Sequence, residues 1–73
     1  MQIIVKNKIE EQVKNYQART GATKTWIAKQ LSMSNQNLHN VFRAINPTIE
    51  TLIKFSLLLE CDVKELYTFT LEK

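Results

Sequence analysis

Five side chains able to pair with base edges lie close together in this chain: Asn35, Gln36, Asn37, His39 and Asn40. Asn and Gln each present an acceptor oxygen and a donor NH₂ group at a fixed separation, which matches the N6 and N7 edge of adenine in the major groove of DNA. An ordinary solvated helix face is the alternative. Such faces are usually rich in Glu and Lys, which have higher helix propensities than Asn. This stretch contains neither, so its composition favours base reading.

The spacing of apolar residues predicts two short helices that carry and support these amides. Apolar residues recur at helical spacing in two successive groups, Ile27, Ala28 and Leu31, then Leu38 and Val41. Residues 32–34 leave room only for a tight turn, in which we expect Met33 to fill the corner and Ser34 to cap the following helix. The sequence therefore predicts helices at residues 24–31 and 35–43 that share one apolar seam.

Another helix is expected before this pair. It spans about residues 7–19 and ends at Gly21, the only glycine of the chain and a natural residue just beyond a helix. Thr23 then caps the next helix, on which we expect Trp26 to pack against the first helix rather than on DNA. The apolar face of the first helix is predicted to consist of Ile9, Val13 and Tyr16.

Two more helices are expected after it. The fourth begins after the predicted N-cap Thr48. Asp62 and Glu65 have the spacing of a capping box, which predicts a short fifth helix ending at Leu66 or Tyr67. No linker or repeat interrupts the chain, so the expected fold is an all-α, five-helix single domain of residues 1–73. The inner stripe of the fourth helix is predicted to be Ile49, Leu52, Ile53, Ser56 and Leu59.

Both ends of the chain carry the signal of a short β-strand. Residues 2–5 are largely apolar and β-branched, and residues 67–71 alternate apolar and polar side chains. Because two strands alone are marginally stable, we expect them to pair with each other or with a second subunit, and frayed ends are the alternative. Leu57 and Leu58 add apolar groups where the fourth helix should face outward. The predicted dimer interface consists of Ile3, Val5, Leu57, Tyr67, Phe69 and Leu71.

The net charge of +3 is unevenly distributed along the chain. Residues 12–49 contain no acidic residue, whereas residues 50–73 contain five acids and three lysines. A polyanion would therefore meet the half of the molecule that contains the amide-rich helix, and contacts with phosphates supply the salt-dependent part of DNA affinity. The cations of the acid-free half are Lys14, Arg19, Lys24, Lys29 and Arg43.

Several classes of function are not expected from this composition. Cys61 is the only cysteine, which predicts a buried structural thiol in a reducing cytoplasm rather than a disulfide or metal site. His39 is the only histidine and has no partner of catalytic type, so we expect no enzyme, cofactor or small-molecule ligand. No stretch reaches the roughly 18 apolar residues of a membrane span, which favours a cytoplasmic protein.

Three stretches of the chain, residues 23–41, 46–52 and 59–67, resemble the lambda-repressor/Cro-like (XRE-type) helix-turn-helix domains of phages and bacteria. The resemblance covers nearly the whole chain. It implies a transcriptional regulator, a repressor by the family's type, that binds a pseudo-palindromic operator in double-stranded DNA as a homodimer. Its most specific part is the combination of Ile27, Ala28, Leu31, Ser34, Leu38 and Val41 with the later Pro47 and Leu52.

The resemblance also implies roles for particular residues. The positions where the family reads bases, at the start of its recognition helix and one turn later, match Asn35, Gln36 and Asn40, and His39 is a further DNA-contacting candidate. In the family, the first residue of the second helix is usually a glutamine that hydrogen-bonds a phosphate. This position matches Lys24, which can contact phosphate as a point charge. Contacts with the DNA backbone are expected from Lys24, Thr25, Ser34, Asn37 and Arg43.

This chain departs from the family pattern at the end of its predicted recognition helix. Ala44 stands where a glycine commonly follows, and the loop before Pro47 is one residue shorter than usual. The contacts of Arg43 and Asn46 with the phosphate backbone depend on this loop.

Two classes of function remain open at this point. The leading hypothesis is a sequence-specific, dimeric DNA-binding regulator that uses the helix Asn35–Arg43. The alternative is a protein-interaction module of the same fold, such as an antitoxin or an accessory subunit. A purely structural role would predict no salt-dependent DNA binding.

Overall fold

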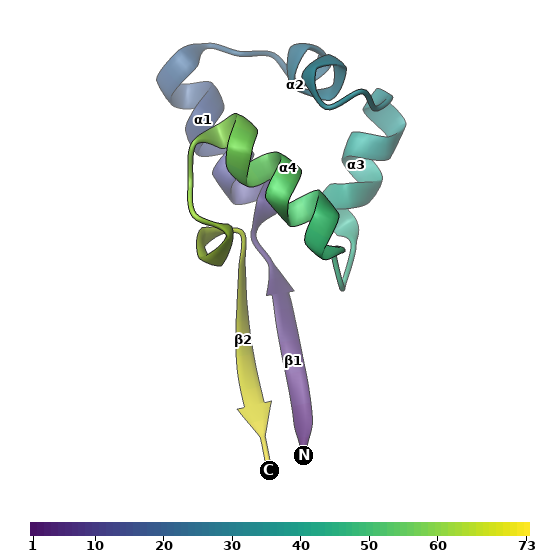
Figure 1. The fold of residues 1–73 in the computed structure, drawn as a ribbon, viewed down its shortest axis with the longest axis vertical. Helices are drawn as coiled ribbons and strands as arrows, with labels where there is room; N and C mark the ends of the chain where they lie inside the picture. The colour runs from purple at the N-terminus through teal and green to yellow at the C-terminus, as the bar shows by residue number, and fades with distance from the viewer.

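The computed structural model describes residues 1–73 and contains a helical globular part from which a two-stranded sheet protrudes (Figure 1). Its principal extents are 42 × 23 × 17 Å, so the molecule is elongated along this sheet. The elements in chain order are β1 (Gln2–Asn7), α1 (Ile9–Thr20), α2 (Lys24–Gln30), α3 (Asn35–Arg43), α4 (Ile49–Leu59), the 3₁₀ turn η1 (Val63–Glu65) and β2 (Tyr67–Glu72).

The helix boundaries follow the local capping signals. The hydroxyl groups of Thr23, Ser34 and Thr48 each accept a hydrogen bond from the backbone N–H three residues later, at 3.0, 3.0 and 3.2 Å. Each therefore satisfies one of the N–H groups that a helix leaves free at its start. Gly21 ends α1 in the left-handed conformation, with φ of 76°. The predicted caps of α2, α3 and α4 and the predicted end of α1 are confirmed.

The core contains residues from all four helices. Ile9, Val13, Ile27, Leu38 and Leu59 were predicted to face inward, and all are buried. The full set of buried residues is Ile9, Val13, Ile27, Ala28, Leu38, Phe42, Leu52, Phe55, Leu59 and Leu66. All four helices contribute to this apolar core, so packing in the core fixes the position of α2 relative to α3.

The inner face of two helices was predicted only in part. On α4, Ile49 and Ile53 are 72% and 46% exposed, and the wholly buried Phe55 lies inside together with Leu52 and Leu59. On α3, Phe42 is buried and Val41 is half-buried. Apolar residues lie on two faces of α4, so helical spacing alone allowed either face to be the inner one.

The prediction of a fifth helix is wrong. The capping box forms, because the backbone N–H of Lys64 donates to the Asp62 carboxylate at 3.0 Å and that of Asp62 to Glu65 at 2.8 Å. It opens only a single 3₁₀ turn, since the buried Leu66 accepts a hydrogen bond from the Lys8 N–H at 2.9 Å. The next residue already belongs to β2, so no second helical turn can follow.

The predicted terminal strands are confirmed, and they pair with each other. β1 and β2 are antiparallel and form the terminal ribbon, with Ile3 opposite Leu71 and Val5 opposite Phe69. β1 extends to Asn7, so the first helix begins two residues later than predicted. Because side chains alternate along a strand, these four apolar residues share one face of the ribbon. The fold is therefore mostly helical, with four α-helices and a small sheet, rather than all-α with five.

No helix of this structure has the length and apolar character needed to cross a membrane.

Candidate nucleic-acid interface

α2 and α3 are joined by the tight turn that the sequence predicts. The Met33 N–H donates to the Ala28 carbonyl at 2.9 Å, and Ser32 adopts the left-handed region with φ of 56°. Met33 and Leu31 are half-buried and pack against the core. The two helices are thus held by hydrogen bonds at the turn and by the apolar seam of Ile27, Ala28 and Leu38.

α3 separates its side chains into an apolar and a polar face. Leu38 and Phe42 are buried, whereas every amide of the helix and its imidazole are exposed. Figure 1 shows α3 at the edge of the globular part. The residues predicted to read bases and their polar neighbour, Asn35, Gln36, Asn37, His39 and Asn40, are all brought onto this outer face.

Two of the amides are hydrogen-bonded to each other. The Gln36 Nε2 donates to the Asn40 Oδ1 at 3.1 Å, one helical turn away. This bond uses one N–H of Gln36 and one lone pair of Asn40, so each side chain keeps a donor and an acceptor. The pair can therefore still make paired hydrogen bonds with base edges, and each side chain limits the rotation of the other.

The first turns of α2 and α3 meet. The Asn35 Nδ2 donates to the Thr25 Oγ1 at 3.4 Å, and both residues are exposed. Ser34 caps α3 through Asn37, so the hydroxyl of Ser34 accepts inside the protein and keeps its own proton for an outside acceptor. The predicted backbone-contact residues Thr25, Ser34 and Asn37 therefore lie around the start of α3.

The cations of the acid-free half do not all belong to this surface. The Lys24 Nζ lies over the Phe42 ring, 5.9 Å from its centre, and Arg43 is exposed at the end of α3. The Arg19 guanidinium instead lies over the Tyr16 ring, 5.5 Å from its centre. The predicted phosphate contacts Lys24 and Arg43 lie on the helices that form the candidate interface, whereas Arg19 does not.

Asn7 takes the place of the missing glycine at the end of α3. Ala44 is extended, with φ of −64°, so this helix has no left-handed cap. The Asn7 Nδ2 donates to the carbonyl oxygens of Val41 and Ala44, each at 2.8 Å. Sequence reasoning missed this contact, since Asn7 lies more than thirty residues before α3 and its only local signal is a preference for helix starts.

The loop after α3 leads into an open hollow of about 290 Å³ beside the candidate interface. Asn37 and Asn40 line it from α3, and Asn46 and Thr48 line it from the loop and the start of α4. Val41, Ala44 and Pro47 also line it, so the hollow combines amide groups with an apolar wall.

Trp26 and Cys61 lie outside the candidate interface. Trp26, which was expected to pack against the first helix, is 42% exposed and borders a hollow with Tyr16 and Thr20 at the end of α1. Cys61 is half-buried rather than buried. Burial, then the carboxylates of Glu65 and Asp62, raise the pKa of its thiol.

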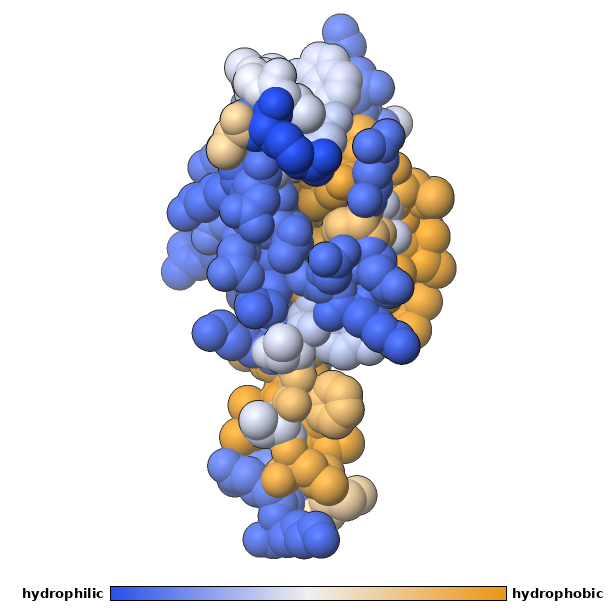
Figure 2. All heavy atoms as spheres, turned by 90° about the vertical axis from the view of Figure 1, so that its left-hand side faces the viewer, coloured by the Kyte–Doolittle hydropathy of each residue, from blue (hydrophilic) through white to orange (hydrophobic).

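The residues of the predicted dimer interface lie on the terminal ribbon and on α4. Phe69 is 63% exposed and Leu57 is 76% exposed. Figure 2 shows apolar atoms gathered on the protruding ribbon below a largely hydrophilic face of the globular part. The ribbon members of the predicted interface, Ile3, Val5, Tyr67, Phe69 and Leu71, share one face of the paired strands.

The chain holds no group of three or more His, Cys, Asp or Glu side chains arranged to bind a metal ion. Comparison of the chain with protein-family models finds no match, and no curated protein is significantly similar to it in sequence.

Proposed function

We propose that this protein binds specific sites in double-stranded DNA and regulates transcription, as its resemblance to the lambda-repressor/Cro-like domains implies. One observation carries the proposal. The second helix of a compact helix-turn-helix presents five exposed amide and imidazole side chains and no carboxylate on its outer face. These are groups that read base edges, and they lie on an element slim enough to enter the major groove.

In the proposed binding mode, α2 and α3 make different contacts with DNA. α3 enters the major groove, where Asn35, Gln36 and Asn40 contact base edges and His39 supplies a further donor or acceptor. The start of α2 and the end of α3 lie along the phosphates, where Lys24 and Arg43 supply charge. Thr25, Ser34 and Asn37 add neutral hydrogen bonds that set the register of the helix on the duplex.

The proposed active form is a homodimer. One recognition helix covers only a few base pairs, whereas two copies related by a twofold axis read two half-sites roughly 34 Å apart. The exposed apolar face of the terminal ribbon supports this assembly, because an isolated two-stranded sheet with such a face is marginally stable in water. A second copy covers that face and Leu57 on α4.

The direct test is selection of binding sites from random DNA, followed by titration of the selected fragment in the presence of excess competitor DNA. We expect a selected site with two related halves and an affinity at least about a thousandfold above that for random DNA. Equal affinity for selected and random fragments would contradict sequence-specific binding. Loss of affinity at increasing salt on both fragments would show the contribution of the phosphate contacts.

A protein-interaction module of the same fold is the second candidate. The observation that favours it is the stripe of exposed apolar residues on α4, Ile49, Ile53 and Leu57, spaced four residues apart. Such a stripe can seat a partner helix. Purified protein that retards no DNA fragment, and whose thermal stability is unchanged by DNA, would favour this candidate over the first.

A further inference from the structure

The C-terminal end of α3 is held by a side chain from the other end of the chain. The last carbonyl groups of a helix have no partner within it, and glycine in the left-handed conformation usually helps to satisfy them. Ala44 does not adopt this conformation. Its own N–H donates to the Val41 carbonyl at 3.2 Å, which leaves further acceptor capacity at the end of the helix.

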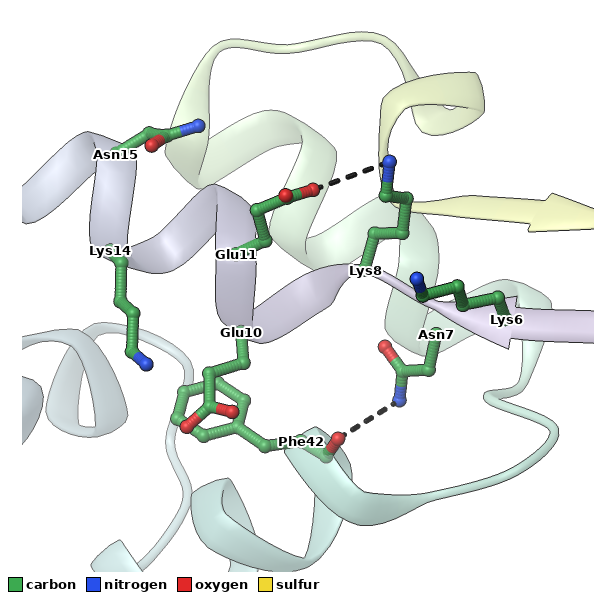
Figure 3. Close-up of a pocket in the computed structure, with 8 residues that line it drawn as sticks. All are labelled: Lys6, Asn7, Lys8, Glu10, Glu11, Lys14, Asn15 and Phe42. Atoms are coloured by element: carbon green, nitrogen blue, oxygen red, sulfur yellow. Dashed lines mark hydrogen bonds and ion pairs between the residues drawn. The ribbon is translucent and has the colours of Figure 1, made fainter.

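Asn7 uses all parts of its amide at this junction. The Asn7 Nδ2 donates to the Val41 and Ala44 carbonyls, each at 2.8 Å, with a longer contact of 3.4 Å to Phe42. The Asn7 Oδ1 accepts from the N–H of Ile9, the first residue of α1, at 2.9 Å. Figure 3 shows the Asn7 side chain directed from the strand toward the backbone of Phe42. One side chain therefore joins the start of α1 to the end of α3.

The position of Asn7 in the fold connects the terminal ribbon to α3. Asn7 is the last residue of β1 and lies opposite Tyr67 in the terminal ribbon. The next residue, Lys8, donates from its N–H to the Leu66 carbonyl at 2.9 Å. The base of the ribbon is thus tied both to the core and to the end of the helix that carries Gln36 and Asn40.

We propose that Asn7 is a positioning residue for α3, which fixes the angle at which the helix presents its amides to DNA. This inference rests on the proposed function. Asn7 touches no base in this mechanism. Since base contacts require donors and acceptors to be placed within fractions of an ångström, a helix released at one end loses specific contacts first. The charge contacts with phosphates, made by the long flexible side chains of Lys24 and Arg43, tolerate the change.

Two variants remove the donor half of the Asn7 amide and keep its acceptor oxygen. Asn7→Ser keeps a short oxygen for the Ile9 N–H but cannot reach the α3 carbonyls. Asn7→Asp keeps the same acceptor and places a negative charge against three carbonyl oxygens at the negative end of a helix. The matched control is Gln17→Ala, because the half-buried Gln17 likewise donates from its amide to a backbone carbonyl, that of Ala22 at 3.2 Å.

The first measurement is backbone hydrogen exchange in the free protein, read residue by residue. In Asn7→Ser we expect the amides of residues 39–43 to exchange about tenfold faster, while α1 and α4 change little, and Asn7→Asp to have a larger effect. Gln17→Ala should leave α3 unchanged. Uniform acceleration over all helices, or none in α3, would overturn the assignment. If Asn7→Asp does not fold, Asn7→Ser and the wild-type protein give the same comparison.

The second measurement is DNA binding on the selected site and on random DNA. We expect Asn7→Ser to lower affinity for the selected site about tenfold and affinity for random DNA less than twofold, with no change in this ratio for Gln17→Ala. Equal losses on both fragments would overturn the positioning role in DNA reading. Faster exchange in α3 together with a wild-type protein that does not discriminate between the fragments would instead contradict the proposed function.

Discussion

At the scale of single residues, the outer face of α3 consists of side chains that constrain one another. The bond of 3.1 Å between Gln36 and Asn40 leaves both amides able to bind bases. Asn35 is similarly held by Thr25. Side chains ordered before binding lose less conformational entropy when they meet a base, which raises the discrimination that each contact can deliver.

Gln36→Ala and Asn40→Ala should each weaken binding to the selected site by about 1–3 kcal/mol, with little change on random DNA. Because the two amides are in contact, the double variant should lose less than the sum of the single losses. Fluorescence anisotropy titrations on both fragments measure these values. Asn15→Ala, an exposed amide in α1, is the control. Equal losses on selected and random DNA would contradict a reading role.

Cys61 gives a prediction about pH. Burial, then Glu65 and Asp62, raise the pKa of the folded thiol above its ordinary value of 9.0, against the opposing effect of Arg19. The unfolded thiol therefore ionises first, so this contribution to stability is complete below about pH 9 and is lost as pH rises toward the folded pKa. Urea unfolding from pH 8 to 10 should show a smaller decline for Cys61→Ala than for the wild-type protein. Parallel declines would contradict the assignment.

At the scale of elements, α2 and α3 have different relations to DNA in the proposed mode. α3 reads bases, whereas the start of α2 and the end of α3 contribute charge that is independent of sequence. The core contacts of Ile27 and Leu38 keep the two helices together, so both types of contact occur at once.

Lys24→Ala should weaken binding to selected and random DNA alike and should lower the salt slope by about one unit, if the lysine neutralises one phosphate. The slope is measured from affinities at several salt concentrations. Lys64→Ala removes an equal charge from η1, outside the helix-turn-helix, and should leave the slope unchanged. The same slope in Lys24→Ala and the wild-type protein would argue against this contact.

At the scale of the whole molecule, the terminal ribbon extends the structure to 42 Å and carries exposed apolar side chains on one face. The terminal ribbon therefore supports the end of α3 through Asn7, and its apolar face forms the proposed contact between subunits. We expect a change at the proposed dimer contact to reach α3, the proposed reading helix, through this short path.

Phe69→Asp should abolish the proposed dimer and lower affinity for a two-part site at least about tenfold, while the helical core stays folded, because Phe69 is 63% exposed in the monomer. Thr68→Asp is the matched control, since it adds the same charge to the opposite face of the ribbon, opposite Lys6. Removal of residues 68–73 should act like Phe69→Asp but also leaves β1 unpaired. Sedimentation velocity at micromolar concentration measures the assembly. A wild-type monomer, both free and on its DNA site, would rule out the dimer.

The local features of this protein could be predicted from its sequence, because they depend on neighbours in the chain. Thr23, Ser34 and Thr48 cap helices through the N–H three residues on, and Gly21 ends α1 because it lacks a Cβ. The alternating residues at the chain ends predicted strands, and the polar composition of α3 predicted its exposed face.

The remaining features were decided by contacts between distant parts of the chain. Phe55 rather than Ile49 and Ile53 fills the core, since only the packing of α4 on α1 selects between its two apolar faces. Pairing of β2 with β1 stops the predicted fifth helix after one turn. Asn7 meets the end of α3 across more than thirty residues, and no local pattern encodes a hydrogen bond whose partners are brought together only by folding.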